Sequence, residues 1–198
     1  MENNQILFLL VTYLVSSIPF GLILTKIFLK KDIRSHGSGN IGATNVTRIA
    51  GKKLGIVTLI LDALKGAVMV VLAMDLFALS DDFDLLIALT AFIAVIGHIF
   101  PIYLRFKGGK GVATAAAVIM VIDPLIGSLV FLIWLALFLS FRVSAVASLG
   151  AVASLIPLCY FLAFSHYYTY LAIALTILIT IRHKENIERL ILKKENKF

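Results

Sequence analysis

The segment KKLGIVTLILDALKGAVMVVLAMDLF, residues 52–77, indicates the fold. It opens with two lysines, continues as the apolar run Leu54–Phe77, and carries Asp75 near its end. Because a helix needs about 20 mostly apolar residues to cross the hydrocarbon core of a membrane, we expect this run to span one. One end of the helix is basic and the other acidic, which is a signature of orientation in the membrane.

The same pattern repeats along the chain. Of the 198 residues, 61% are hydrophobic and 15% are charged, whereas soluble domains average about 45–50% and about 25%. We therefore predict an all-α integral membrane protein, built as a single membrane-embedded domain over residues 1–198. Seven candidate transmembrane helices follow from the apolar runs: Ile6–Phe28, Leu54–Phe77, Leu85–Leu104, Val112–Ile122, Leu125–Phe141, Ser144–Phe164 and Tyr168–Ile181. Val112–Ile122 is short, so it is either shielded by its neighbours or extended through Gly108–Gly111.

Seven spans place every Lys and Arg except Lys65 on one side of the membrane. The basic groups lie in Thr25–Lys53, in Arg105–Lys110, at Arg142, and in the tail from Arg182 to Lys197. The opposite side carries Glu2, Asp75, Asp81, Asp82, Asp84 and Asp123. Since cytoplasmic loops carry excess Lys and Arg, we expect the N-terminus outside and the C-terminus in the cytoplasm. Orientation also accounts for the net charge of +7, so no nucleic-acid partner is expected.

The only long polar connection contains GSGNIGATNVTR, residues 37–48. Glycines allow the backbone to approach a ligand closely, and successive exposed N–H groups can bind an anion. Arg48 adds a bidentate donor for phosphate. The candidate binding residues of this segment are Gly37, Ser38, Gly39, Asn40, Gly42, Thr44, Asn45 and Arg48. The alternative is a flexible turn between helices.

A second glycine-rich segment, KGGKG, precedes an apolar helix. A helix N-terminus offers free N–H groups and a positive dipole, so Lys107, Gly108, Gly109, Lys110 and Gly111 are candidates for binding phosphate. The alternative is an ordinary basic turn. His98, a few residues upstream, either serves this site or is an interior hydrogen-bonded histidine.

Two further groups of residues leave alternatives open. His183 and Asn186 share one face of a helix continuing from the last apolar run; the alternative there is an interfacial amphipathic tail. Ser144 lies in the same plane as Arg142, as a site residue or a helix cap. Asp62 and Lys65 lie inside a span and can pair, either for function or to fix helix packing.

These motifs together resemble the acyl-phosphate:glycerol-3-phosphate acyltransferase family of bacterial membranes. The resemblance rests on residues 38–48, on Gly97-His98 through residues 107–114, and on His183–Leu190, with Asp62–Gly66 as a further stretch. It implies transfer of a fatty acyl group from acyl phosphate to the 1-hydroxyl of sn-glycerol 3-phosphate, giving lysophosphatidic acid and phosphate in the bacterial inner membrane. It further implies an active site that faces the cytoplasm and no covalent acyl-enzyme.

Under this reading the residues take distinct roles. Arg48 and Lys107 hold phosphates, and Ser38 with the glycine-rich backbone binds the acyl-phosphate head or its oxyanion. Ser144, His183 and Asn186 orient glycerol 3-phosphate. Either His183 or the substrate's own phosphate takes the hydroxyl proton. No metal site is expected from the histidine spacing, and we expect no cofactor and a monomer.

A small transporter or channel for a phosphorylated metabolite is the main rival. Transporters often carry internal repeats, and the sequence shows none. The polar motifs also gather toward one face of the membrane. A purely structural membrane subunit would leave these motifs unexplained.

Overall fold

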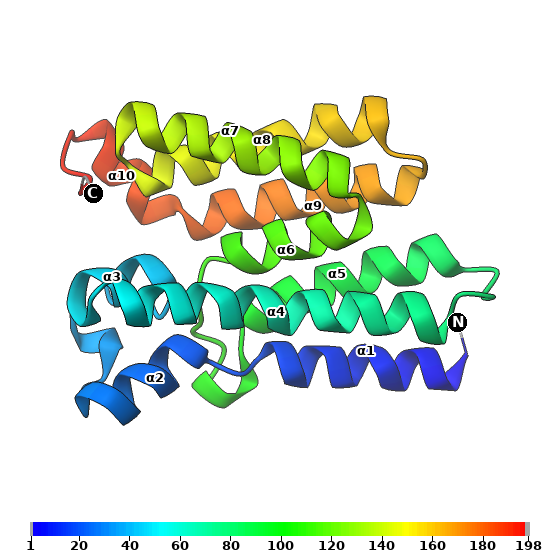
Figure 1. The fold of residues 1–198 in the computed structure, drawn as a ribbon, viewed down its shortest axis with the longest axis horizontal. Coiled ribbons are helices and arrows are strands. Elements are labelled where there is room, and N and C mark those ends of the chain that lie inside the picture. The colour runs from blue at the N-terminus through cyan, green and yellow to red at the C-terminus, as the bar shows by residue number, and fades with distance from the viewer. Residues whose placement is uncertain (1, 197–198) are drawn as a thin grey trace. The chain divides into compact units, whose positions relative to one another are not determined.

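The computed structural model describes residues 2–196, in which the regular elements are α-helices and short 3₁₀-helices (Figure 1). The chain forms two compact units, Met1–Val118 and Ile119–Phe198, with the boundary inside helix α6. The elements of unit 1 are α1 (Asn3–Ser16), α2 (Phe20–Leu29), η1 (Ile33–Ser35), α3 (Ala43–Ala50), α4 (Lys52–Leu76), α5 (Phe83–Ile99), η2 (Ile102–Leu104) and the start of α6 (Val112–Ile122). Unit 2 contains α7 (Pro124–Phe141), α8 (Ser144–Leu162), α9 (His166–Arg182) and α10 (Lys184–Ile191).

Five segments of the described residues are long and apolar enough to cross a membrane, judged by length and composition: Asn3–Leu29, Lys52–Leu76, Phe83–Leu104, Pro124–Phe141 and Ser144–Leu162. Their outward side chains include Ile60, Leu132 and Phe161, which are 50%, 56% and 77% exposed. An apolar exterior of this kind requires lipid as its solvent. The remaining two predicted spans are the 11-residue α6 and the 17-residue α9, so seven crossings stay a prediction.

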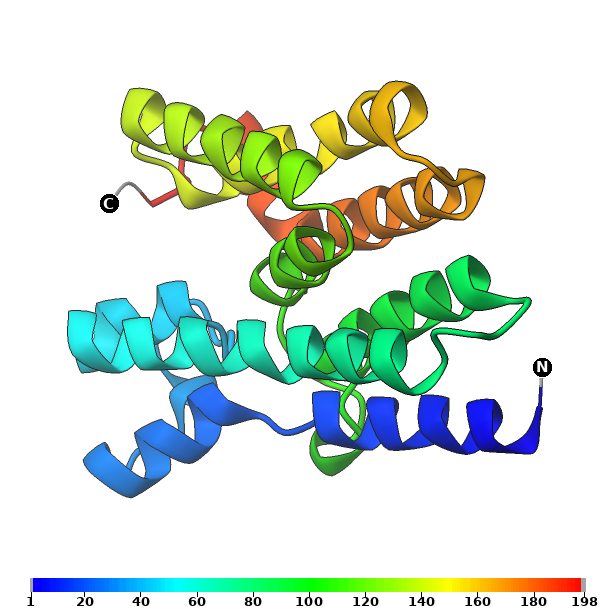
Figure 2. The same ribbon diagram turned by 45° about the vertical axis from the view of Figure 1, so that its right-hand side comes forward.

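The prediction of one continuous helix over Ile6–Phe28 is wrong. The run divides into α1 and α2 around Ser17–Pro19 (Figure 2). Proline lacks a backbone N–H and disfavours helical backbone in the residue before it, so the helix ends there. Backbone released at membrane depth needs a polar partner. The Ile18 carbonyl finds one in the ammonium group of Lys65, at 2.9 Å.

The helix predicted over Leu85–Leu104 ends at Ile99 instead, because the chain turns before Pro101. The following residues fold back against the end of α5, where the Gly108 N–H donates to the Ile99 carbonyl (3.0 Å). Helix α6 then begins beside the middle of α4, where the Thr114 hydroxyl donates to the Asp62 carbonyl (2.8 Å). At about 1.5 Å per residue α6 is about 16 Å long. Its shortness therefore follows from starting part-way along α4.

Unit 2 is a bundle in which α8 packs against both α7 and α9. Helix α7 begins where its sequence dictates: Asp123 caps the N-terminus by accepting from the N–H groups of Leu125 and Ile126, and Pro124 occupies the first turn. The Thr176 hydroxyl joins α9 to α8 through the Val152 carbonyl (2.8 Å). The prediction that the last helix continues unbroken past Arg182 is wrong, because a turn at His183 separates α9 from α10.

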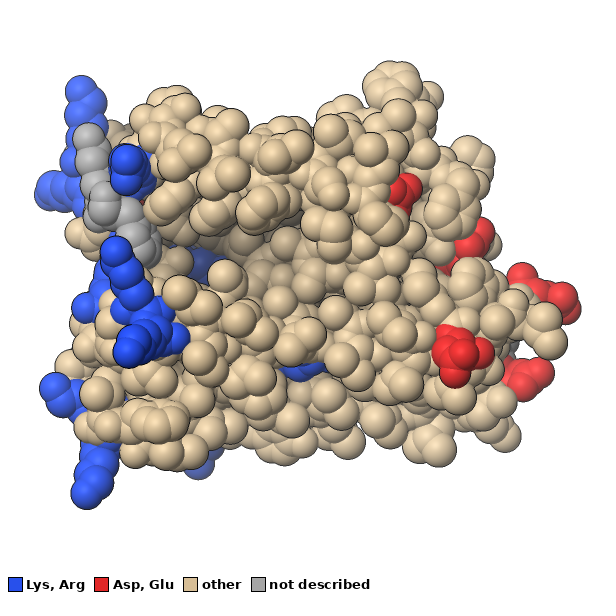
Figure 3. All heavy atoms as spheres, viewed as in Figure 1, with Lys and Arg blue, Asp and Glu red and all other residues tan. Residues whose placement is uncertain are grey.

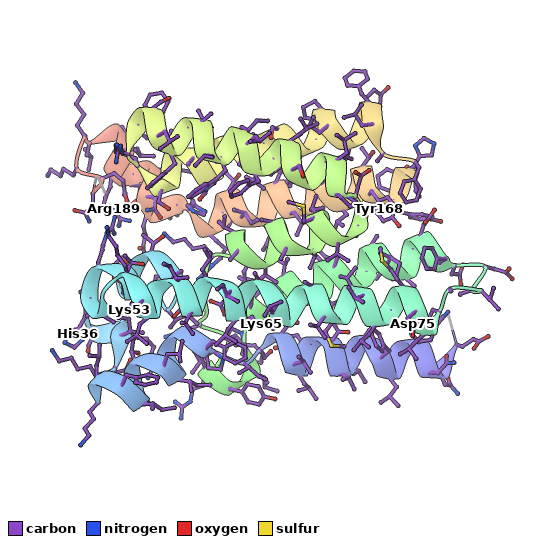
Figure 4. The ribbon with its side chains drawn as sticks, viewed as in Figure 1. His36, Lys53, Lys65, Asp75, Tyr168 and Arg189 are labelled. Atoms are coloured by element: carbon purple, nitrogen blue, oxygen red, sulfur yellow. The ribbon has the colours of Figure 1, made fainter. Side chains whose placement is uncertain are left out.

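Charges gather at the ends of the helices. On the face of unit 1 shown in Figure 3, Lys and Arg cluster at the end where α3 lies, and Asp and Glu cluster at the other end. Figure 4 places His36 and Lys53 at the first end of unit 1, Asp75 at the second, and Lys65 between them. This separation agrees with the predicted orientation in the membrane, which stays a prediction. Lys197, which the prediction placed on the basic side, lies outside the described residues.

Candidate functional site

The first glycine-rich segment folds around the side chain of Asn45. This residue, in the first turn of α3, is 2% exposed. Its side-chain carbonyl accepts from the Ser38 N–H (3.0 Å), and its amide donates to the carbonyls of His36 (3.0 Å) and Asn40 (2.8 Å). Gly37 has φ +59°, and a Cβ there would overlap the Asn45 side-chain oxygen. Asn45 therefore shapes the loop, although its residue type had indicated direct contact with a ligand.

The remaining polar residues of the segment surround this centre. Ser38 and Gly39 are exposed, and Gly39 also has a positive φ of +70°. The Asn40 side chain accepts from the N–H of Gly42, which precedes α3 (2.8 Å). Thr44 lies in the first turn of α3 and is half-buried. The N–H groups of Ser38, Gly39 and Gly42 donate within the loop, so the donors left for an anion come from the Ser38 hydroxyl and the N-terminus of α3.

Arg48 lies in the last turn of α3, four residues after Thr44 and on the same side of the helix. Its side chain is half-buried. Helix α3 is held close to α4 because Gly55 leaves room for Thr47, whose hydroxyl a Cβ at that position would overlap. The guanidinium is therefore carried by a fixed helix, while the loop before that helix presents backbone.

The loop begins with a local ion pair. Asp32 accepts from the backbone N–H of Arg34 (3.0 Å) and, through both carboxylate oxygens, from its guanidinium (2.9 and 2.6 Å). The hydrogen bonds from the Arg34 side chain hold the pKa of that carboxyl well below its usual range. The pair is solvent-exposed and fixes the entry to the loop.

The role of Asn45 leads to a stability prediction. Asn45→Asp replaces the donating amide with a carboxylate that faces two carbonyl oxygens and is buried. Leaving buried polar groups unsatisfied costs about 1–3 kcal/mol each, and more for charges, so we expect a loss of at least about 3 kcal/mol of unfolding free energy, measured by thermal unfolding in detergent. Asn40→Asp is the matched control, because its retained oxygen still accepts from Gly42. Equal stability of the two variants would contradict the loop-shaping role.

The second glycine-rich segment lies against His98. The N–H of Gly109 donates to the His98 carbonyl (3.1 Å), and a Cβ on Gly109 would overlap the imidazole Nε2. Gly111 has φ +87° and leads into α6. Lys107 is exposed and Lys110 half-buried. The segment therefore combines a tightly seated glycine backbone, two lysines and a helix N-terminus, an arrangement suited to phosphate.

Beneath this segment lies a buried group of charges. Asp62 and Lys65 form the predicted ion pair, with 2.9 Å between carboxylate and ammonium, and both side chains are 3% exposed. The Nδ1 atom of His98 lies 3.6 Å from the same carboxylate oxygen. His98 is thus an interior histidine that lies against Gly109, and its service to a binding site stays a prediction.

In unit 2, His183 lies at the turn between α9 and α10 and is 3% exposed. Its Nδ1 lies 2.8 Å from the Ile179 carbonyl, which can only accept, so Nδ1 carries a proton. In the neutral ring Nε2 is then the basic nitrogen. Ser144 begins α8 and is half-buried, two residues after Arg142, which has φ +55°.

The sequence did not predict a role for Glu195. Its side chain is 6% exposed and accepts from the Asn186 amide (2.9 Å) and from Arg189 Nε (2.7 Å). Asn186 and Arg189 therefore bind a carboxylate that comes from the chain's own tail. Helical spacing relates Asn186 to Arg189, but no periodic pattern of the sequence predicts where Glu195 in the irregular tail will lie.

Among residues 2–196 no group of three or more His, Cys, Asp or Glu side chains is arranged to hold a metal ion. The candidate groups of unit 1 are Ser38, Arg48 and the Lys107–Gly111 segment, and those of unit 2 are Ser144, His183 and Asn186. All of them are polar or cationic, and the amide of Asn186 already donates to Glu195.

Comparison with known proteins agrees with this chemistry. Residues 6–193 match the glycerol-3-phosphate acyltransferase family. Glycerol-3-phosphate acyltransferases of Syntrophotalea carbinolica and Myxococcus xanthus are each 44% identical to the chain; both alignments cover 96% of it, with 95% and 97% of the respective relatives.

The fold is similar to the crystal structure of PlsY (YgiH), an integral membrane glycerol 3-phosphate acyltransferase, in its glycerol 3-phosphate form. The TM-score is 0.93 at 37% identity, covering 99% of this chain and 96% of that one. The lysophosphatidic acid form gives a TM-score of 0.89. Together with the apolar helices, these similarities show that the chain is an integral membrane protein of the glycerol-3-phosphate acyltransferase family.

Proposed function

We propose that the protein transfers a fatty acyl group from acyl phosphate to the 1-hydroxyl of sn-glycerol 3-phosphate, giving lysophosphatidic acid and inorganic phosphate. The observation that carries the proposal is the family match over residues 6–193. The same chain carries two glycine-rich segments, one with Arg48 and the other with Lys107. Two phosphate-bearing substrates must approach each other, so cations and hydrogen-bond donors at helix N-termini are the chemistry required.

The reaction needs little covalent participation from the protein. Acyl phosphate is a mixed anhydride with a good leaving group. The substrate hydroxyl attacks the acyl carbon, its proton goes to His183 Nε2 or to the substrate's own phosphate, and the bond from acyl carbon to phosphate oxygen breaks. Positioning and charge stabilisation then supply the rate, without a covalent acyl-enzyme.

We assign roles on the same basis. Arg48 and Lys107 bind phosphate, and Ser38 stabilises the acyl-phosphate head or its oxyanion. Ser144, His183 and Asn186 orient glycerol 3-phosphate. The substrate-binding set also includes Gly37, Gly39, Asn40, Gly42, Thr44, Asn45, Gly108, Gly109, Lys110 and Gly111. Within this set, the hydrogen bonds of Asn45 favour a part in holding the loop that contacts substrate.

The proposal includes a topology. Seven crossings, with the N-terminus outside and the C-terminus in the cytoplasm, put the basic segments on the cytoplasmic side of a bacterial inner membrane. The whole chain acts as one functional domain and as a monomer. Long acyl chains then stay in lipid while the phosphates are bound by protein.

The test is an assay of the purified full chain in detergent with radiolabelled glycerol 3-phosphate. We expect lysophosphatidic acid and phosphate in equal amounts from acyl phosphate, and no labelled product above the protein-free blank from acyl-CoA. Turnover in detergent needs no second compartment, so it also separates an enzyme from a transporter. Equal rates from the two donors would contradict the proposed specificity.

A further inference from the structure

The buried ionisable residues Asp62, Lys65 and His98 form a connected group that the proposed chemistry does not use. Lys65 joins the Asp62 carboxylate (2.9 Å) to the Ile18 carbonyl at the α1–α2 break (2.9 Å). Figure 4 shows Lys65 well inside the length of α4, away from Lys53 at its start. Ionisable groups at such depth are costly, and a buried ion pair can often be replaced by apolar residues without loss of stability. Stability alone therefore does not account for the group.

The contacts of Asp62 lead to the middle of the second glycine-rich segment and to the helix that follows it. Its carboxylate lies 3.6 Å from His98 Nδ1, and the opposite side of that imidazole lies against Gly109. Its backbone carbonyl accepts from Thr114, three residues beyond Gly111 in the first turn of α6 (2.8 Å). Asp62 thus contacts both His98, which lies against Gly109, and Thr114, which lies in the helix that follows the segment.

The imidazole of His98 packs directly against Gly109. All three of the nearest atoms to a Cβ on Gly109 belong to the His98 ring. Gly108 differs, because the atoms nearest to its Cβ are the backbone carbonyls of His98 and Ile99 and the ring of Pro101. A rotation of the imidazole would therefore shift the backbone at Gly109, and the Asp62 carboxylate is the charged group beside Nδ1 that opposes such a rotation.

We propose that Asp62, acting through His98, is a positioning residue that sets the Gly108–Gly109 backbone, and with it Lys107 and the N-terminus of α6, for phosphate. This inference rests on the proposed function, in which that segment binds a substrate phosphate. Asp62 touches no substrate. Lys65 holds the carboxylate in place while it satisfies the backbone opened by Pro19.

The test compares Asp62→Asn, His98→Ala and the double variant in the same detergent assay, with Asp75→Asn, the exposed aspartate of α4, as control. We expect kcat/KM to fall about 10–100-fold in each single variant. The double variant should be no less active than the less active of the two single variants, because both residues act through one contact. The melting temperatures are measured in parallel, so that loss of fold is not taken for loss of positioning.

A second pair of variants tests the contact between His98 and Gly109 directly and leaves Asp62 unchanged. Gly109→Ala should lower kcat/KM further than His98→Ala does, and adding His98→Ala should recover at least about 5-fold of that loss, up to the activity of His98→Ala alone, because the overlapping ring is gone. Gly108→Ala should show no such recovery, since backbone blocks it.

Any of three results would overturn the inference. The first is a kcat/KM for Asp62→Asn within twofold of the wild type, and the second is additive effects of Asp62→Asn and His98→Ala. The third is a double variant Gly109→Ala, His98→Ala that is no more active than Gly109→Ala. An inactive wild type would instead overturn the proposed function itself.

Discussion

Replacing Arg48 with alanine is expected to lower kcat/KM by at least about 10³-fold. Removing one preorganised donor from a developing negative charge costs about 10²–10³ in rate, and the guanidinium also offsets repulsion between two anionic substrates. Arg48→Lys should recover only part of the loss, because an ammonium group keeps the charge but cannot donate in the planar bidentate geometry. The measurement is steady-state kinetics of the purified chain with both substrates varied.

Lys107→Ala is expected to show a loss of the same order. Its matched control is Lys53→Ala, which removes a second exposed lysine of unit 1 that lies at the start of α4. If Lys53→Ala and Lys107→Ala were equally active, the phosphate-binding role of the second glycine-rich segment would be wrong. A loss shared by both variants would indicate only a general attraction of substrate by positive charge, which added salt would reveal.

The helices were predictable because their apolar runs are long and are separated by Gly, Pro and charged residues. Their breaks were less so. The run Ile6–Phe28 stays apolar on both sides of Pro19, so its mean hydropathy carries no sign of the end of α1. The end of α5 at Ile99 has the same origin, since Pro101 stands inside an apolar stretch and the residues after it pack against the helix they leave.

The side-chain contacts depended on distances along the chain. The Asp62–Lys65 pair was predictable because helical spacing brings i and i+3 together. No spacing rule relates Asp62 to His98, because they lie on different helices and meet only when α4 packs against α5. The same holds for Glu195 and Asn186, which meet because the tail folds back on α10.

Asn45 illustrates a different limit. An amide beside glycines suits either a ligand or the loop itself, since the same donors and acceptor serve both. Only the folded chain distinguishes them, by the burial of Asn45 and its bonds to Ser38, His36 and Asn40. Ser38 and Gly39 are exposed, and their contact with substrate stays a prediction.

Replacing His183 is expected to lower kcat by about 10²–10⁴-fold, the range typical of general-base catalysis. His183→Asn is the informative variant, because its amide can still donate to the Ile179 carbonyl as Nδ1 does, while nothing remains at the position of the basic Nε2. The fold should therefore survive, and KM for glycerol 3-phosphate should change less than kcat. His166→Asn, the exposed histidine at the other end of α9, is the matched control and should match the wild type. Near-normal kcat in His183→Asn would remove His183 from the role of base and assign the proton to the phosphate of the substrate itself.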